Sequence, residues 1–156
     1  MIALNIIWPV FAMVAWIFVV WFWVLIVRMR HSSRVPWTDT TFATAESSQR
    51  YFEPVELPAN NLRNLFEMPV LFFALVPLLV IAQQATVAQV VLAWAFVVLR
   101  MAHSYIHIVV RRVRVRAPMY WLSTAVLMAM WIGFAIDMIG AASSYHAAIA
   151  AVSAQP

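Results

Sequence analysis

The sequence predicts an all-α integral membrane protein, a four-helix bundle with both termini on the non-cytoplasmic side. Of its 156 residues, 65% are hydrophobic and only 10% are charged, and the mean hydropathy is +0.87. This composition is too apolar for a soluble globular domain. Four apolar stretches each approach or exceed the ~20 residues that cross ~30 Å of hydrocarbon. We therefore expect one transmembrane domain, residues 1–156.

The four helices are expected at about 4–30, 60–83, 87–114 and 118–142. The first run is too long for a signal peptide, lacks a basic start and has no small-residue cleavage pattern, so we interpret it as a retained helix. Residues 31–59 form the one substantial loop, because serines and prolines interrupt it and most of the acidic residues lie there. The other links are short, which predicts antiparallel neighbours.

The basic residues are all arginines, and their distribution predicts the topology. They cluster after the first helix, at the start of the second and at the end of the third, whereas the segment 83–89 and the tail after Ala141 have none. By the positive-inside rule the arginine-bearing ends face the cytoplasm. The use of arginine without lysine is typical of GC-rich bacterial genomes, so we expect a bacterial inner membrane. Arginines spread along an exposed surface would be needed to bind nucleic acid, and this pattern argues against it. No cysteine is present, which excludes disulfides and thiolate sites.

Polar residues within the second and third helices form two stripes. In the second helix they are spaced i, i+3, i+4 and i+7, and in the third they repeat every three or four residues, so that each set lies on one face. The stripes consist of Asn60, Arg63, Asn64 and Glu67, and of Arg100, His103, Ser104, His107, Arg111 and Arg114.

The two stripes lie at similar depth from the cytoplasmic side. At ~1.5 Å per residue, Glu67 is ~10 Å deep and lies between His107 and His103, at ~7 and ~13 Å. Ionisable groups inside a membrane usually face the bundle interior or a polar cavity. Two interpretations remain open: an interhelical network that holds the bundle together, and a small-molecule site built on that network. A metal or haem site is disfavoured, because His103 and His107 lack a metalloprotease motif and a carboxylate on the same helix.

The segments NNLRNLFEMPVLFFAL, from Asn60, and LRMAHSYIHIVVRRVRVR, from Leu99, together resemble the MAPEG family, the membrane-associated proteins in eicosanoid and glutathione metabolism, particularly its bacterial members. The resemblance covers essentially the whole chain. It implies a homotrimer of four-helix subunits in which glutathione binds in cytoplasm-facing clefts between subunits. Lipophilic substrates are expected to enter from the bilayer.

Carried over residue by residue, Asn64 and Glu67 match the family's glutathione-holding Asn and Glu. The family's pattern Arg-x-x-Tyr-x-x-x-Tyr is present as Arg100, His103 and His107, with both tyrosines replaced by histidine. An arginine four residues before the Asn is replaced by Asn60. Arg114 aligns with the arginine that is thought to activate the thiol.

Glutathione requires several convergent cations, because it carries two carboxylates and a thiol that reacts as the thiolate. Arg63, Arg111 and Arg114 are the candidates. One hypothesis is a glutathione-dependent transferase or peroxidase acting on lipophilic substrates, with Arg114 assisting the thiolate and the stripes shaping the site. The alternative is a non-catalytic lipid-binding scaffold or an accessory subunit of a larger membrane complex.

Overall fold

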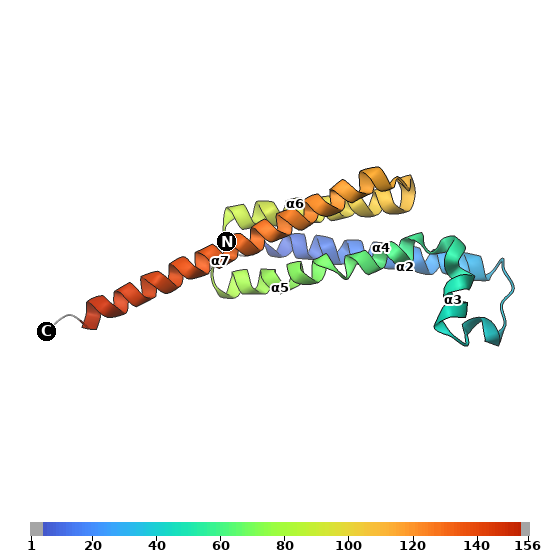
Figure 1. Ribbon diagram of the computed structural model, residues 1–156, viewed down its shortest axis with the longest axis horizontal. Coiled ribbons are helices and arrows are strands. Elements are labelled where there is room, and N and C mark those ends of the chain that lie inside the picture. Colours follow the sequence, from blue (N-terminus) through green and yellow to red (C-terminus); the bar gives the residue numbers. More distant parts are fainter. Residues whose placement is uncertain (1–4, 154–156) are drawn as a thin grey trace.

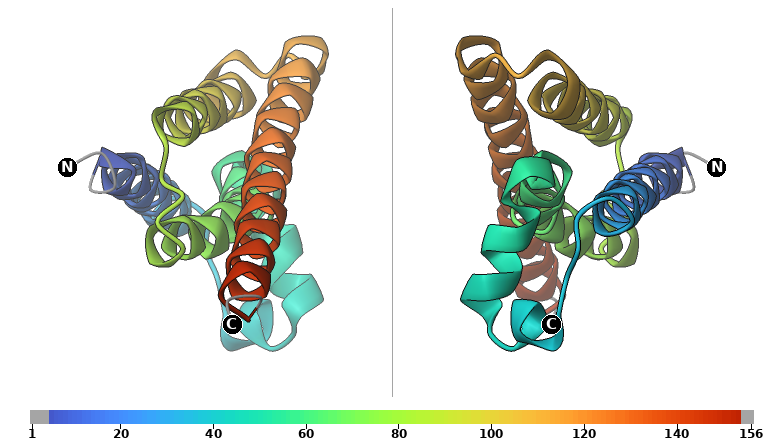
Figure 2. Two further views of the ribbon diagram at one scale, coloured as in Figure 1. Left: turned by 90° about the vertical axis from the view of Figure 1, so that its left-hand side faces the viewer. Right: turned by 90° about the vertical axis from the view of Figure 1, so that its right-hand side faces the viewer.

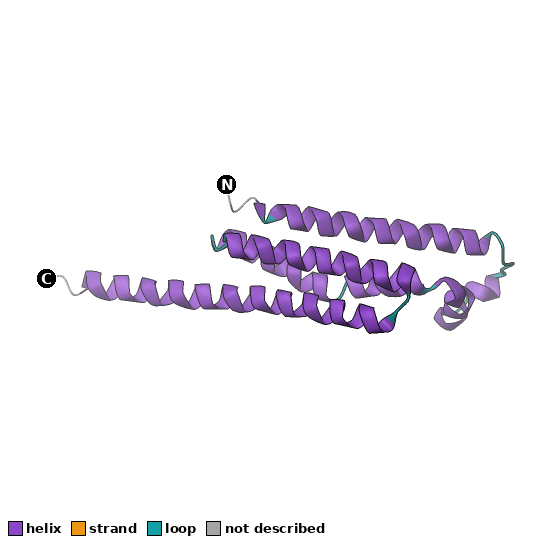
Figure 3. Ribbon diagram, turned by 90° about the horizontal axis from the view of Figure 1, so that it is seen from above, coloured by secondary structure: helices purple, strands orange, loops and turns teal. Residues whose placement is uncertain are grey.

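The protein is described by a computed structural model that covers residues 5–153. Four helical segments are long and apolar enough to cross a membrane, and no strand occurs among residues 5–153. Figure 3 shows the chain as helices joined by short loops. The expectation of an all-α membrane bundle is confirmed.

The first span is α2 (Ile7–Ser32) and the second consists of α4 (Leu57–Leu65) and α5 (Met68–Ile81). The third is α6 (Val87–Tyr105), continued by the π-helical turn η3 (Ile106–Val110), and the fourth is α7 (Val113–Ser153). The expected start of the first helix at residue 4 lies outside the described residues. Seen along the bundle axis, α6 lies next to α7, and α2 next to α4 and α5 (Figure 2).

The connection after α2 is largely helical rather than an open loop. It contains the 3-10 turn η1 (Asp39–Phe42), α3 (Ala45–Phe52) and the 3-10 turn η2 (Glu53–Val55). Thr44 caps α3, because its hydroxyl accepts a hydrogen bond from the Ser47 N–H at 3.1 Å. The connection and the turn between α6 and α7 lie at the same end of the bundle, opposite the start of α2 (Figure 1). We call this the arginine-rich end.

The core is apolar and lies between the long helices. Phe72 of α5 and Phe96 of α6 are fully buried, and their ring centroids are 5.0 Å apart. Large apolar side chains remain exposed on every span, as expected when lipid is the solvent. At the end opposite the arginines, the buried Gln89 of α6 donates to the Met130 carbonyl of α7 at 3.1 Å. This bond ties the antiparallel pair together.

The second span, expected as one helix, is broken between Leu65 and Met68. Pro69 is the second residue of α5 and supplies the reason. Its ring has no N–H, clashes with the carbonyl four residues earlier and disfavours helical backbone at the residue before it. The backbone at Glu67 is correspondingly irregular, with φ −93° and ψ −91°. Glu67 therefore lies at a helix break inside the span.

The third span ends in a wide turn before the chain reverses. Arg111 N–H donates to the Ile106 carbonyl at 2.8 Å, a spacing of five residues. Arg111 itself adopts the left-handed conformation, with φ 58°, which is uncommon for a residue other than glycine and ends the helix. A continuous helix was expected to residue 114, but Arg114 belongs instead to the first turn of α7.

Helix α7 is longer at both ends than the expected 118–142. It starts at Val113, so Pro118 lies inside it, and it continues to Ser153 over 41 residues. At ~1.5 Å per residue its length is ~60 Å, about twice a hydrocarbon core. In Figure 1 its C-terminal part extends well beyond the other helices.

Candidate functional site

The two polar stripes meet at the break in the second span. Arg100 is fully buried, and its Nη2 donates a hydrogen bond to the carbonyl of Asn64. In an uninterrupted helix that carbonyl would pair with the N–H of Met68, four residues on. The break frees the carbonyl, and Arg100 satisfies it. The two polar stripes therefore make a direct contact.

A polar pocket of about 440 Å³ opens beside this contact. It combines two cationic side chains, one carboxylate, two amides and one imidazole. These groups come from α4, from the break in the second span, from η3 and from α7. The lining residues are Leu57, Asn60, Arg63, Asn64, Glu67, His107 and Arg116. Members of both predicted stripes therefore share one cavity.

Glu67 lies at the edge of this pocket and is exposed in the single chain. The Tyr120 hydroxyl of α7 donates to Glu67 Oε2 at 3.4 Å. The ring of Tyr120 also lies 5.2 Å from the Arg100 guanidinium carbon, in cation–π geometry. Tyr120 therefore links the carboxylate to the buried arginine, a role that sequence reasoning missed.

The two histidines are both buried but differ in their contacts. His103 Nδ1 lies 3.2 Å from the Arg116 carbonyl and donates to it, whereas His103 Nε2 has no hydrogen-bond partner within residues 5–153. His107 lines the polar pocket, and its Nδ1 also lacks a partner there. Buried polar groups are usually paired, so these two nitrogens are candidates for a hydrogen bond to a ligand or a water molecule. Within the described chain, no group of three or more His, Cys, Asp or Glu is arranged to hold a metal ion.

Three of the four arginines near the turn between α6 and α7 occupy different environments. Arg111 Nε donates to the Ile108 carbonyl at 3.4 Å and does not line the pocket. Arg114 is exposed and lies outside the pocket, whereas Arg116 lines it. The predicted stripe assumed one continuous helix through residue 114. The π-helical turn and the reversal at Arg111 change that register and bring Arg116 to the site.

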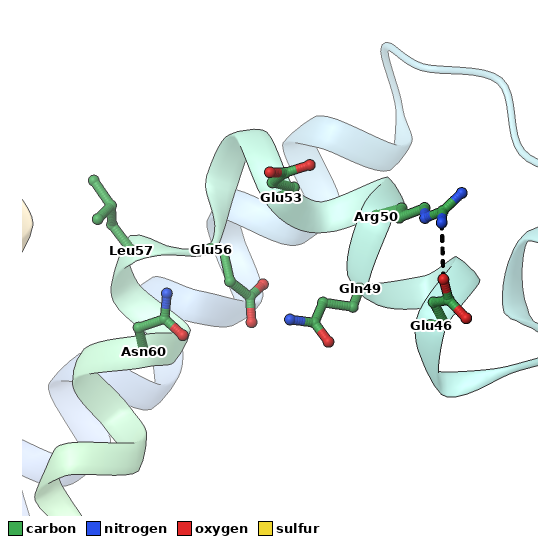
Figure 4. Close-up of a pocket in the computed structure, with 7 residues that line it drawn as sticks. All are labelled: Glu46, Gln49, Arg50, Glu53, Glu56, Leu57 and Asn60. Atoms are coloured by element: carbon green, nitrogen blue, oxygen red, sulfur yellow. Dashed lines mark hydrogen bonds and ion pairs between the residues drawn. The ribbon is translucent and has the colours of Figure 1, made fainter.

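A buried carboxylate at the start of α4 was also missed. Glu56 is 8% exposed and pairs with Arg28 at 3.1 Å and with Arg63 at 3.3 Å. It contributes to a second polar pocket of about 530 Å³, together with α3 residues. Figure 4 shows Glu56 and Asn60 pointing into this space and the exposed pair of Glu46 and Arg50 at its far side. Glu56 thus connects α2 to the helix that carries the polar stripe.

An apolar groove of about 470 Å³ runs between α5 and α7. It begins immediately after Glu67 and one helical turn after Tyr120. Its lining consists of Met68, Leu71, Thr124, Leu127, Met128, Trp131 and Ile132. A polar pocket and an apolar groove therefore lie on either side of the Glu67–Tyr120 bond.

The model of the MAPEG family matches residues 6–136. The chain belongs to the MAPEG family. The match includes the helix break, both polar stripes and the apolar groove, so the whole candidate site of this MAPEG protein lies inside it. It ends near the point where α7 leaves the bundle. Neither curated proteins nor solved structures gave a match to this MAPEG chain.

Proposed function

We propose that this MAPEG protein binds glutathione in the polar pocket and uses it as a transferase or peroxidase on lipophilic substrates. The observation that carries the proposal is the pairing of the two cavities. One is polar and contains Arg63, Glu67 and Arg116, and the other is apolar and starts at Met68. A peptide thiol and a lipophilic electrophile need these two kinds of surface side by side.

The residues of the pocket fit the charges of glutathione. Arg63 and Arg116 suit its two carboxylates, and Glu67 suits its ammonium group. The unpaired Nδ1 of the buried His107 provides another polar contact. Asn60 and Asn64 add amide hydrogen bonds. We assign the positioning of glutathione to this set, to which Arg100 and His103 contribute from the buried side.

Glutathione supplies the reacting thiol. Cations near the sulfur favour its thiolate form. In a transferase the sulfur bonds to the electrophilic carbon, the leaving group departs and the thiol proton passes to water. In a peroxidase two thiols are oxidised to a disulfide while a hydroperoxide is reduced to an alcohol and water. The family resemblance assigns the activating cation to Arg114, whereas the pocket favours Arg116.

We further propose a homotrimer in a bacterial inner membrane with both termini outside. The positions of the arginines support this orientation, because the connection after α2 and the turn before α7 lie at one end of the bundle (Figure 1). In a trimer, a neighbouring subunit would cover part of the exposed surface around Glu67. In the trimer, the exposed Arg111 and Arg114 would contact the glutathione pocket of such a neighbouring subunit.

The second candidate function is a non-catalytic lipid-binding scaffold or an accessory subunit of a larger membrane complex. The observation that favours it is the structural use of Arg100, which satisfies a main-chain carbonyl, and of Glu56, which joins two arginines. In this interpretation the polar residues stabilise the bundle and the apolar groove holds lipid.

Thermal unfolding of the purified protein with millimolar glutathione separates the two functions. A ligand that binds only the folded state raises the unfolding temperature as its concentration rises. We expect stabilisation by glutathione and by its analogue with a methyl group in place of the thiol, but none by free glutamate and glycine at equal ionic strength. No stabilisation, together with no turnover of several electrophiles, would leave the scaffold as the function.

A further inference from the structure

A small basic pocket lies at the end of α2, apart from the polar pocket. It has a volume of about 230 Å³ and is lined by Val27, Arg30, His31, Arg34 and Val55. Neither Arg30 nor Arg34 forms a salt bridge among residues 5–153, in contrast to Arg28 on the same helix, which pairs with Glu56. No acidic residue lines the pocket. Its chemistry therefore suits a monoanion or dianion with several oxygen acceptors.

The pocket is held in shape by contacts around it. The His31 ring packs edge-on against Tyr51 of α3, with centroids 4.9 Å apart. The Tyr51 hydroxyl donates to the Val35 carbonyl at 2.8 Å, which ties the segment after α2 to α3. Ser33 Oγ donates to the Arg30 carbonyl at 3.0 Å. The arginines thus project from a fixed backbone, which lowers the cost of ordering them around a ligand.

The carbonyls at the C-terminal end of α2 repel an anion less strongly than unpaired carbonyls at a helix end would. N–H groups of Ser33, Arg34 and Val35 donate back to the carbonyls of Met29 and His31. These bonds satisfy the groups that would otherwise repel a negative charge. The two guanidinium groups therefore dominate the local electrostatics.

The depth of the pocket identifies the source of the anion. The apolar part of α2, from Ile7 to Val27, spans ~31 Å at ~1.5 Å per residue, which matches one hydrocarbon core. Arg30 then lies ~4 Å beyond the boundary, at the level of the lipid phosphates. One turn deeper than Val27, the exposed Trp23 offers an apolar surface along which acyl chains can run. Basic pockets at this level are the kind that bind anionic lipid headgroups.

We propose that the pocket formed by Val27, Arg30, His31, Arg34 and Val55 binds the phosphate of an anionic phospholipid. Both guanidinium groups bind the phosphate oxygens, His31 provides a polar wall, and the valines contact the glycerol backbone. The site does not depend on the glutathione function.

The test is native mass spectrometry of the full-length protein titrated with phosphatidylglycerol or with phosphatidylcholine of the same acyl chains. We expect retention of phosphatidylglycerol by the wild type. The double variant Arg30→Gln/Arg34→Gln is expected to weaken that retention by about tenfold. The control Arg50→Gln/Arg112→Gln removes the same charge from the same end of the bundle outside the pocket, and should retain the lipid.

A second variant makes the test independent of net charge. Val55→Phe fills the pocket and leaves both arginines in place, so it is also expected to lose the lipid. Equal loss in the Arg50/Arg112 control would overturn the proposal, since binding would then reflect charge alone. Displacement of the lipid by millimolar inorganic phosphate, or by glutathione, would also overturn it, because the pocket would then belong to a soluble anion.

Discussion

The Arg100 guanidinium donates to the main-chain carbonyl of Asn64, which the break in the second span leaves without its helical partner. This hydrogen bond compensates for burying Arg100 in the membrane beside the proposed glutathione pocket. The bond depends on Pro69, because a regular helix at this point would use the same carbonyl itself. This relationship leads to the first prediction.

Arg100→Ala should lower the free energy of unfolding by about 2–4 kcal/mol, because it leaves a cavity and an unpaired carbonyl. Pro69→Ala in the same chain should restore part of this loss, because the helix can then close across the break. Equilibrium unfolding in detergent of the wild type, both single variants and the double variant measures the coupling. Additive effects of the two changes would show that the bond and the break are independent.

Glu56→Gln should destabilise the protein by about 1–2 kcal/mol, because it removes a buried carboxylate shared by Arg28 and Arg63. The estimate is modest because both arginines keep partial access to solvent. Glu46→Gln is the matched control, since its pair with Arg50 is exposed on both sides and should be worth under about 0.5 kcal/mol. Thermal unfolding at low and high salt measures both variants. Equal losses would show that burial of Glu56 contributes nothing.

Arg116→Ala should lower turnover with a generic electrophile by more than about tenfold, equivalent to ~1.4 kcal/mol of transition-state stabilisation. Arg114→Ala should have a smaller effect, because that side chain is exposed outside the pocket. Steady-state kinetics with varied glutathione separates binding from the chemical step. A larger loss of turnover in Arg114→Ala than in Arg116→Ala would assign activation of the thiol to Arg114. Arg114 would then act in the site of a neighbouring subunit.

Single cysteines at Ser48 and Ser144 test the orientation, since the native chain has none. Ser48 lies in α3 at the arginine-rich end, and Ser144 lies near the far end of α7. A membrane-impermeant thiol reagent should label Ser144→Cys in intact cells and Ser48→Cys only after the cells are opened. Labelling of both positions from outside would contradict the four-pass topology.

Periodicity and composition were sufficient to predict the membrane bundle and the approach of the two polar stripes to each other. Each stripe depends on side-chain spacing along a helix, and depth follows from counting residues. The pattern could not show the break at Glu67, although Pro69 was the signal for it. A proline inside an apolar run does not by itself say whether a membrane helix bends or separates into two.

The positions of Glu56, Arg116 and Tyr120 could not be predicted in the same way. Glu56 was placed in a loop, whereas Pro58 in the first turn of α4 indicated a helix that starts at Leu57. Arg116 and Tyr120 reach the site only because the chain turns at Arg111 in a left-handed conformation. No residue spacing predicts this left-handed conformation, and arginine rarely adopts it.

The unusual length of α7 makes the two ends of this small protein different in shape. A four-helix bundle embedded in a lipid disc offers little outside the disc by which single particles can be aligned in electron microscopy. Here the segment from Asp137 to Ser153 forms a rod of about 24 Å on one side, and the α3 connection forms a blunt cap on the other (Figure 1). Projection images would therefore distinguish the two faces of the membrane without an added antibody fragment.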